Sequence, residues 1–235
     1  MLSSALIAGF LAGLLCALLQ FLLVQPDILM AERYESGELV HFQGVAARTE
    51  APMDMKAGPA LDHGASDAGS VLMRHGLTVL FAVLTYCGYG LVLLGGIQLA
   101  EQSGIKLGTA QALLWGLAGF MAFQMMPALG LEPELPGTPP SDLTQRQLWW
   151  AASALATIIG LWFLFYGTAL WQRVLGVGVL TLPYIWGAPK VDHYGGIVPP
   201  ELSASFAAHS LGVGLITWMA LGALVVHFWH ADTAR

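Results

Sequence analysis

The sequence predicts an all-α protein, a polytopic bundle of transmembrane helices with one long loop outside the membrane. Hydrophobic residues make up 56% of the 235 residues and charged residues only 10%, against about 25% in soluble proteins. The apolar residues come in long blocks separated by short polar pieces, which is typical of an integral membrane protein. We therefore expect residues 1–235 to form a single membrane domain in contact with the lipid bilayer.

Six segments are the candidate membrane spans. A helix needs about 20 mostly apolar residues to cross the hydrocarbon core. Five blocks meet this length, and residues 171–188 are a short sixth block that contains Arg173 and Pro183. Residues 149–188 would make a helix of about 60 Å, which suits two crossings, so we predict six spans and keep five as the alternative. The spans are residues 2–24, 72–98, 108–129, 149–167, 171–188 and 204–228, and residues 25–71 are predicted to form a flexible acidic loop.

The charged residues divide unevenly between the two faces of this topology. We call the face with the N-terminus face I and the opposite one face II. Thirteen of the fifteen acids and six of the nine basic residues fall on face II, which gives it a net charge of −7 and leaves +1 on face I. Face I has its three basic residues in short connections and a tail, so the positive-inside rule favours face I as cytoplasmic. We expect a multi-pass protein of the bacterial inner membrane whose acidic outer face attracts cations.

Two histidines within the spans are the main site candidates. His75 lies four residues inside the second span and His209 about six residues inside the sixth, so both fall near one depth below face II. Ionisable groups within spans usually face the bundle interior and mark a pathway. The two imidazoles could hold a divalent ion; the alternative is that each binds a backbone carbonyl. Oxygen and nitrogen ligands to complete the shell are available at Glu32, Glu132, Glu134, Asp192 and His193.

Two other metal chemistries stay open. A bis-histidine haem between His75 and His209 is conceivable, although no attachment motif supports it. The long loop contains Met53–Met55, His41 and His63, whose thioethers, carboxylate and imidazoles could collect metal ions without a closed-site spacing.

An apolar helix breaks abruptly in the segment GLAGFMAFQMMPALGLEPELPG, residues 116–137. Gly116 and Gly119 provide a small face for close helix packing, and Gln124 brings an amide into the span. Pro127 has no N–H, so it kinks or ends the helix and frees carbonyls that protein, water or an ion must satisfy. We interpret the break as structural and the acids after it as candidates for function.

The segment LPYIWGAPKVDHYGG, residues 182–196, repeats this arrangement with Pro183 followed by Tyr184. Broken helices of this kind often line binding sites in transporters. The run RQLWW, residues 146–150, is typical of an aromatic belt at a membrane interface.

The sequence lacks the motifs that are typical of several function classes. The sequence has no phosphate-binding glycine-rich loop, no Ser-His-Asp arrangement and no basic patch for nucleic acid. We therefore expect neither an enzyme nor a nucleic-acid-binding protein, and no permanently bound cofactor.

Five runs carry a resemblance to a known family. They are GLAGFMAFQMMPALGLEPELPG, RQLWW, GAP at 187–189, VPPELSASFAAHSLG at 198–212 and ILMAERYE at 28–35. Together they are similar to CbtA, a bacterial family of predicted cobalt-transporter subunits. The resemblance implies cobalt import for cobalamin synthesis and a small single-span partner with a histidine-rich tail. It favours Glu32, Gln124, Glu132, Glu134 and His209 as functional positions, to which the residues alone add His75.

The chain departs from the family pattern at two places. Its first long loop has only two histidines, and Tyr184 follows Pro183 where many members have histidine. The leading hypothesis is uptake of a divalent transition metal, most simply cobalt as the transported ion. A non-transporting membrane scaffold that assembles with a metal-binding partner is the alternative, and a membrane redox or haem protein is the third.

Overall fold

The computed structural model describes residues 2–40, 68–104, 108–138, 141–191 and 196–233. These residues form helices joined by turns and short irregular segments, with no strand among them. The helices are α1 (Leu2–Leu19), π-helical η1 (Gln20–Val24), α2 (Gln25–Glu35), α3 (Ala68–Gln102), α4 (Thr109–Phe120), π-helical η2 (Met121–Met125), α5 (Met126–Ala128), α6 (Leu143–Tyr166), α7 (Leu170–Trp186) and α8 (Pro200–Thr233). The predicted all-α class is confirmed.

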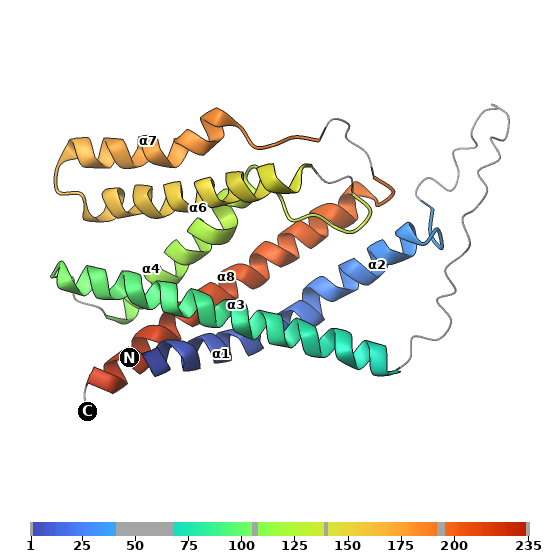
Figure 1. Ribbon diagram of the computed structural model, residues 1–235, viewed down its shortest axis with the longest axis horizontal. Helices are drawn as coiled ribbons and strands as arrows, with labels where there is room; N and C mark the ends of the chain where they lie inside the picture. Colours follow the sequence, from blue (N-terminus) through green and yellow to red (C-terminus); the bar gives the residue numbers. More distant parts are fainter. Residues whose placement is uncertain (1, 41–67, 105–107, 139–140, 192–195, 234–235) are drawn as a thin grey trace.

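The helices form two packed groups, which Figure 1 shows along the length of the molecule. In the first group α1 packs on α3 and α8, and α8 also packs on α4. In the second, α6 and α7 pack on each other as a hairpin, and α6 contacts η2 and α5. The start of α1 and the end of α8 lie close together at one end of the molecule (Figure 1), as expected when the chain crosses a membrane an even number of times.

Four helices of the described residues are long and apolar enough to cross a membrane. They are Leu2–Glu35, Val71–Gln102, Leu143–Tyr166 and Pro200–Ala231. The other two predicted spans are also helical but are interrupted or short. The helix from Thr109 to Ala128 contains the π-helical turn η2, and α7 has 17 residues with Pro183 inside it.

The first helix is longer than the sequence predicted. We expected the span to end at residue 24, whereas the helix continues through η1 and α2 to Glu35. Pro26 has no N–H to donate, and the wider π-helical turn η1 directly precedes α2. The residues after Pro26 include good helix formers. The part of the predicted loop from 41 to 67, with His41, His63 and Met53–Met55, lies outside the described residues.

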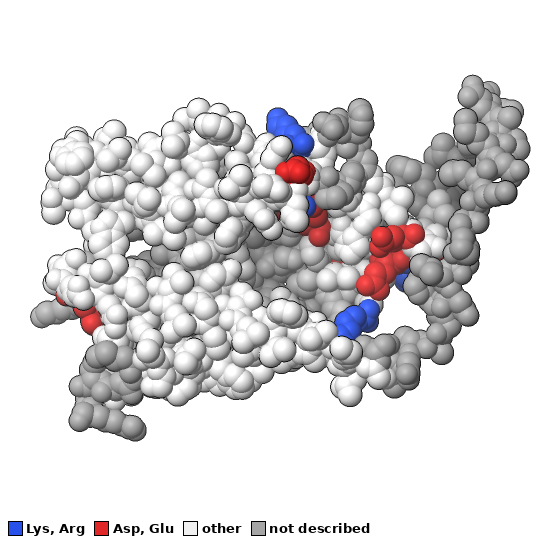
Figure 2. All heavy atoms as spheres, in the orientation of Figure 1, with Lys and Arg blue, Asp and Glu red and all other residues white. Residues whose placement is uncertain are grey.

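Charged side chains gather toward the ends of the helices. Figure 2 shows a broad uncharged middle on one face of the molecule, with most Lys, Arg, Asp and Glu toward the α2 end and a few acids at the opposite end. Large apolar side chains along the helices are exposed, such as Leu84, Ile159 and Phe165. Exposed apolar area of this extent between charged ends suits lipid rather than water.

Small residues let the helices approach closely. A β-carbon at Gly116 would meet the Trp218 carbonyl of α8, and one at Gly119 would meet the Trp218 indole. Gly116 and Gly119 therefore both lie against α8. Gly9 of α1 meets the backbone of α3 at Cys87 in the same way, so both helix pairs depend on the absence of a side chain.

Candidate functional site

A buried carboxylate and an imidazole meet where α2 crosses α8. The Nδ1 atom of His209 lies 2.8 Å from Oδ2 of Asp27, and the hydroxyl of Ser205 donates to the same oxygen over 3.4 Å. The Asp27 side chain is 12% exposed and that of His209 is 41% exposed. Because a carboxylate only accepts hydrogen bonds, Nδ1 is the donor. Nε2 is then the ring nitrogen left to act as a metal ligand.

The local sequence explains this meeting. Ser205 and His209 are four residues apart on α8, so they share one face of the helix. Asp27 follows Pro26 at the start of α2, directly after the π-helical turn η1. Of the described acids and bases, Asp27 is the only buried one. Sequence analysis missed Asp27 because it placed residues 25–71 in a loop; its place one turn beyond an apolar helix was the available signal.

His75 does not join His209 in this site. Its ring packs edge-on against Phe21, with the centroids 5.2 Å apart, whereas His209 bonds Asp27. The described residues contain no group of three or more His, Cys, Asp and Glu side chains that could hold a metal ion. A complete metal shell would thus need water or ligands from outside these residues.

Most of the other predicted acidic ligands have basic neighbours. Glu134 forms an ion pair of 2.9 Å with Arg146, and both side chains are partly buried. Glu32 lies 3.9 Å from Arg74, with both side chains about half exposed. Glu132 is exposed. Of the three, Glu132 is the carboxylate best placed to receive an ion from solution.

Asp192 and His193 lie outside the described residues. At the exposed end of α2, a hydrogen bond of 2.9 Å from Arg33 holds the pKa of the Glu38 carboxyl below its usual range. The Glu38 carboxylate therefore stands beside a basic partner at this end of the molecule.

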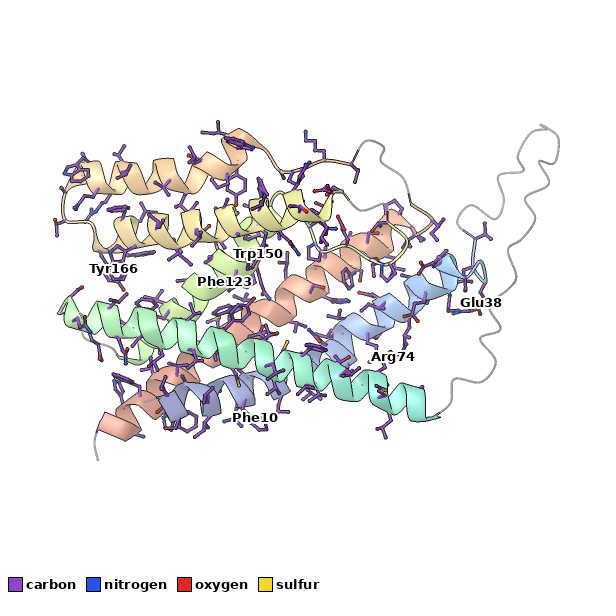
Figure 3. All side chains as sticks on the ribbon, viewed as in Figure 1. Phe10, Glu38, Arg74, Phe123, Trp150 and Tyr166 are labelled. Atoms are coloured by element: carbon purple, nitrogen blue, oxygen red, sulfur yellow. The ribbon has the colours of Figure 1, made fainter. Side chains whose placement is uncertain are left out.

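The broken helix at Pro127 is braced by side chains of the α6–α7 hairpin. Pro127 has no N–H to offer to the Phe123 carbonyl four residues earlier, and Nε1 of Trp150 donates to that carbonyl over 3.2 Å. Figure 3 shows Trp150 beside Phe123. The hydroxyl of Tyr184 donates to the carbonyl of Met126. The expectation that the freed carbonyls require partners is confirmed, with protein as the partner.

Side chains of α6 also contact the second broken helix, but at the proline's own carbonyl, which accepts from Gly187 N as well. Trp149 is buried, and its Nε1 atom donates to the carbonyl of Pro183 over 3.3 Å. The Tyr184 hydroxyl also lies 3.4 Å from that of Ser153 on α6. Trp149 and Trp150 thus donate hydrogen bonds to backbone carbonyls at the two proline breaks.

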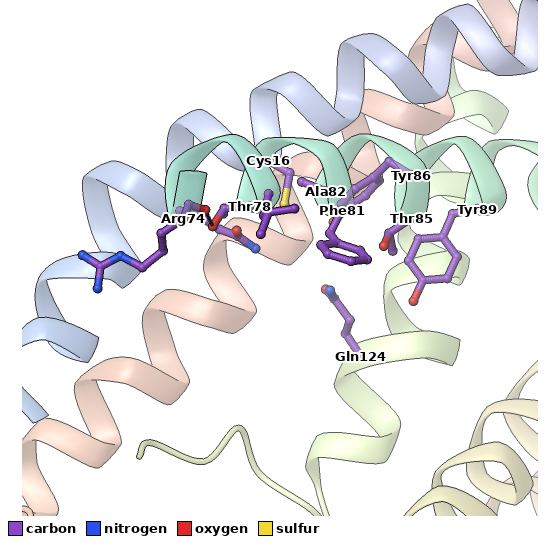
Figure 4. A pocket seen from close by; sticks show the side chains of 11 residues that line it. Cys16, Arg74, Thr78, Phe81, Ala82, Thr85, Tyr86, Tyr89 and Gln124 are labelled. Carbon is purple, nitrogen blue, oxygen red and sulfur yellow. Dashed lines mark hydrogen bonds between the residues drawn. The ribbon is translucent and has the colours of Figure 1, made fainter. Parts of the chain in front are cut away.

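A cleft of about 550 Å³ opens between α1, η1, α3 and η2. Its lining includes Gln20, Arg74, Thr85, Tyr86 and Gln124. Figure 4 shows Gln124 pointing into the cleft, while the Arg74 guanidinium points away from its deep end. The amide of Gln124 also packs against Gly214 of α8, where a β-carbon would overlap its oxygen. The structure thus places Gln124 at a polar cleft in the middle of the bundle.

Comparison with known proteins identifies the family of the chain. The family model for CbtA, described as a probable cobalt transporter subunit, matches residues 1–230. No curated protein and no solved structure matches the chain. Because the family model covers nearly the whole sequence, the resemblance seen in the sequence is confirmed, and the chain belongs to the CbtA family of probable cobalt transporter subunits.

Proposed function

We propose that this chain is the membrane subunit for uptake of a divalent transition-metal ion, with cobalt for cobalamin synthesis as the cargo. The family description supports transport of cobalt, and the gathering of acids toward one end of the molecule supports attraction of a cation. In this proposal the chain crosses the bacterial inner membrane six times with its acidic end outside, and a small single-span partner with a histidine-rich tail delivers the ion.

The observation that carries the proposal is the hydrogen bond between His209 and Asp27. Histidines that bind metals commonly donate their other ring N–H to a carboxylate, which fixes the ring and makes the free nitrogen a better ligand. Asp27 stands in that position, 2.8 Å from Nδ1. His209 Nε2 is then a ligand for the passing ion, and Asp27 is a positioning residue.

The test is cobalt uptake by cells that express the native chain, Asp27→Asn, His209→Ala or His227→Ala. His227 is the matched control because it is an exposed histidine of the same helix near its other end. We expect His209→Ala to abolish uptake and Asp27→Asn to lower it about 10- to 100-fold, with His227→Ala unchanged. All four chains must reach the membrane at equal levels. Loss of uptake in all three variants, or in none, would contradict the assignment.

A second candidate is a membrane scaffold that assembles with a metal-binding partner. The lack of a three-ligand group among the described residues favours it. It predicts that His209→Ala keeps full uptake while a larger residue at Gly116, which would push α4 away from α8, abolishes it. The same uptake measurement on both variants distinguishes the two functions.

A further inference from the structure

The lining of the cleft combines apolar residues such as Leu77 and Phe81 with neutral polar side chains, and its described residues include no Asp, Glu or His. Its polar groups come from three elements: Gln20 of η1, Thr85 and Tyr86 of α3, and Gln124 of η2. Both glutamines lie in π-helical turns, and such turns appear frequently at functional sites. Two helices that each deviate from α geometry at a glutamine facing one cleft indicate a binding region rather than ordinary packing.

Two buried oxygens at this cleft lack hydrogen-bond partners in the described protein. They are Oη of Tyr86, a residue that is only 3% exposed, and Oε1 of Gln124. A buried polar atom without a partner costs about 1–3 kcal/mol. Other atoms of both residues line the cleft, while these two oxygens are buried beside it, so a small movement of either side chain would bring its oxygen to water or a hydrated solute. The volume of about 550 Å³ holds on the order of ten to twenty waters at ~30 Å³ each.

We propose that this cleft is a water-filled vestibule through which a divalent cation, still carrying its water shell, reaches the middle of the bundle. The oxygens of Gln124 and Tyr86 accept hydrogen bonds from the water molecules of the ion. This inference rests on the proposed function and adds the path and the form in which the ion travels.

The chemistry of the lining favours a hydrated cation over a bare one. Among the described lining residues there is no Asp, Glu or His, so the cleft has no ligand set that would strip water from the ion. Water bound to a cation directs its hydrogens outward, toward acceptors such as amide and hydroxyl oxygens. Passage also requires binding weak enough for the ion to leave, which neutral oxygens provide.

Arg74 does not make the vestibule an anion site. Its guanidinium lies 3.9 Å from the Glu32 carboxylate and points away from the deep end where Gln124 lies (Figure 4). The positive charge at the mouth is therefore offset by a carboxylate, and the deep part carries no fixed charge to attract an anion.

Cysteine labelling tests the vestibule without any uptake measurement. Thr85→Cys and Leu84→Cys are introduced singly into the full chain with Cys16→Ala and Cys87→Ala, in lipid nanodiscs that expose both faces. Thr85 lines the cleft, whereas its neighbour Leu84 is 57% exposed and does not line it. We expect a water-soluble cationic methanethiosulfonate to modify Thr85→Cys at least tenfold faster than Leu84→Cys, and Co²⁺ to slow the reaction.

Two labelling results would overturn the proposal. Equal rates at the two positions would mean that the cleft is filled by lipid or side chains. Faster reaction of Thr85→Cys with an anionic than with a cationic reagent would make the cleft an anion site.

Cobalt uptake then tests the path, with Gln124→Leu compared with Leu84→Ala as a control of similar depth. We expect Gln124→Leu to lower uptake at least fivefold at equal membrane level and Leu84→Ala to leave it unchanged. Full uptake by Gln124→Leu would refute the path while leaving the proposed function intact. Absence of uptake by the native chain would instead refute the proposed function, and the labelling result would still decide whether the cleft is hydrated.

Discussion

His209 of α8 bonds Asp27 of α2 through Nδ1, 2.8 Å from the carboxylate oxygen, and so joins residues 182 positions apart in the sequence. The pair lies where the start of α2 packs on α8. A side chain that both anchors a helix and presents a ligand nitrogen has two separable roles, and variants can separate them.

Asparagine and glutamine at position 209 distinguish these roles. The amide nitrogen of Asn lies near the place of Nδ1, so His209→Asn keeps a donor for Asp27 but has no Nε2 ligand. We expect both His209→Asn and His209→Gln to lose uptake. His209→Gln should also lower the free energy of unfolding by about 1–3 kcal/mol, because the buried carboxylate loses the nearer of its two donors and keeps only Ser205. His209→Asn should lower it less. Reversible unfolding in mixed micelles measures this difference; equal losses of stability would refute the donor role of Nδ1.

Substitution by alanine is expected to affect stability at Gly116 and cobalt uptake at Gly214. A β-carbon at Gly116 meets the Trp218 backbone, which cannot yield, whereas one at Gly214 meets the amide end of the flexible Gln124 side chain. We expect Gly116→Ala to lower the free energy of unfolding by about 1–3 kcal/mol through overpacking. Gly214→Ala should leave stability nearly unchanged and lower cobalt uptake by displacing the amide. Destabilisation by Gly214→Ala as large as that by Gly116→Ala would contradict this account.

Trp150→Phe tests the brace at the Pro127 break. The substitution removes the N–H that satisfies the Phe123 carbonyl, and we expect a loss of about 1–3 kcal/mol of stability. Trp186→Phe is the control because Trp186 is 91% exposed. Thermal unfolding in detergent should show a lower midpoint for Trp150→Phe and an unchanged midpoint for Trp186→Phe. An equal decrease in both variants would mean that loss of the indole ring matters more than loss of the hydrogen bond to Phe123.

The Glu134–Arg146 ion pair ties the segment after the break to α6. We expect Glu134→Gln and Arg146→Gln to lower stability by similar amounts and the double variant to lower it less than their sum. A coupling free energy of up to ~1 kcal/mol is expected for a partly exposed pair. If Glu134 instead binds the cargo, Glu134→Gln should reduce cobalt uptake strongly while Arg146→Gln does not.

The helices could be predicted from the sequence because apolar blocks and prolines act locally. All six predicted spans are helical, Gly116 and Gly119 lie against α8, and the freed Phe123 carbonyl has a partner. The identity of that partner could not be predicted, since it depends on how α6 lies beside η2. The depth of His75 and His209 could be counted along the chain, but the direction of each ring depends on helix rotation, at about 100° per residue.

The two π-helical turns have a consequence for comparing related chains. A turn closed by i→i+5 hydrogen bonds contains one residue more than an α-helical turn. Deleting one residue within Gln20–Val24 or Met121–Met125 therefore gives a regular α-helix, and the helical segments on either side keep their relative orientation. Asp27 would still meet His209 in such a chain, and α4 would still pack on α8. A one-residue gap at either place in an alignment of relatives would therefore mark members that keep this fold and have lost one of the two glutamine-bearing turns.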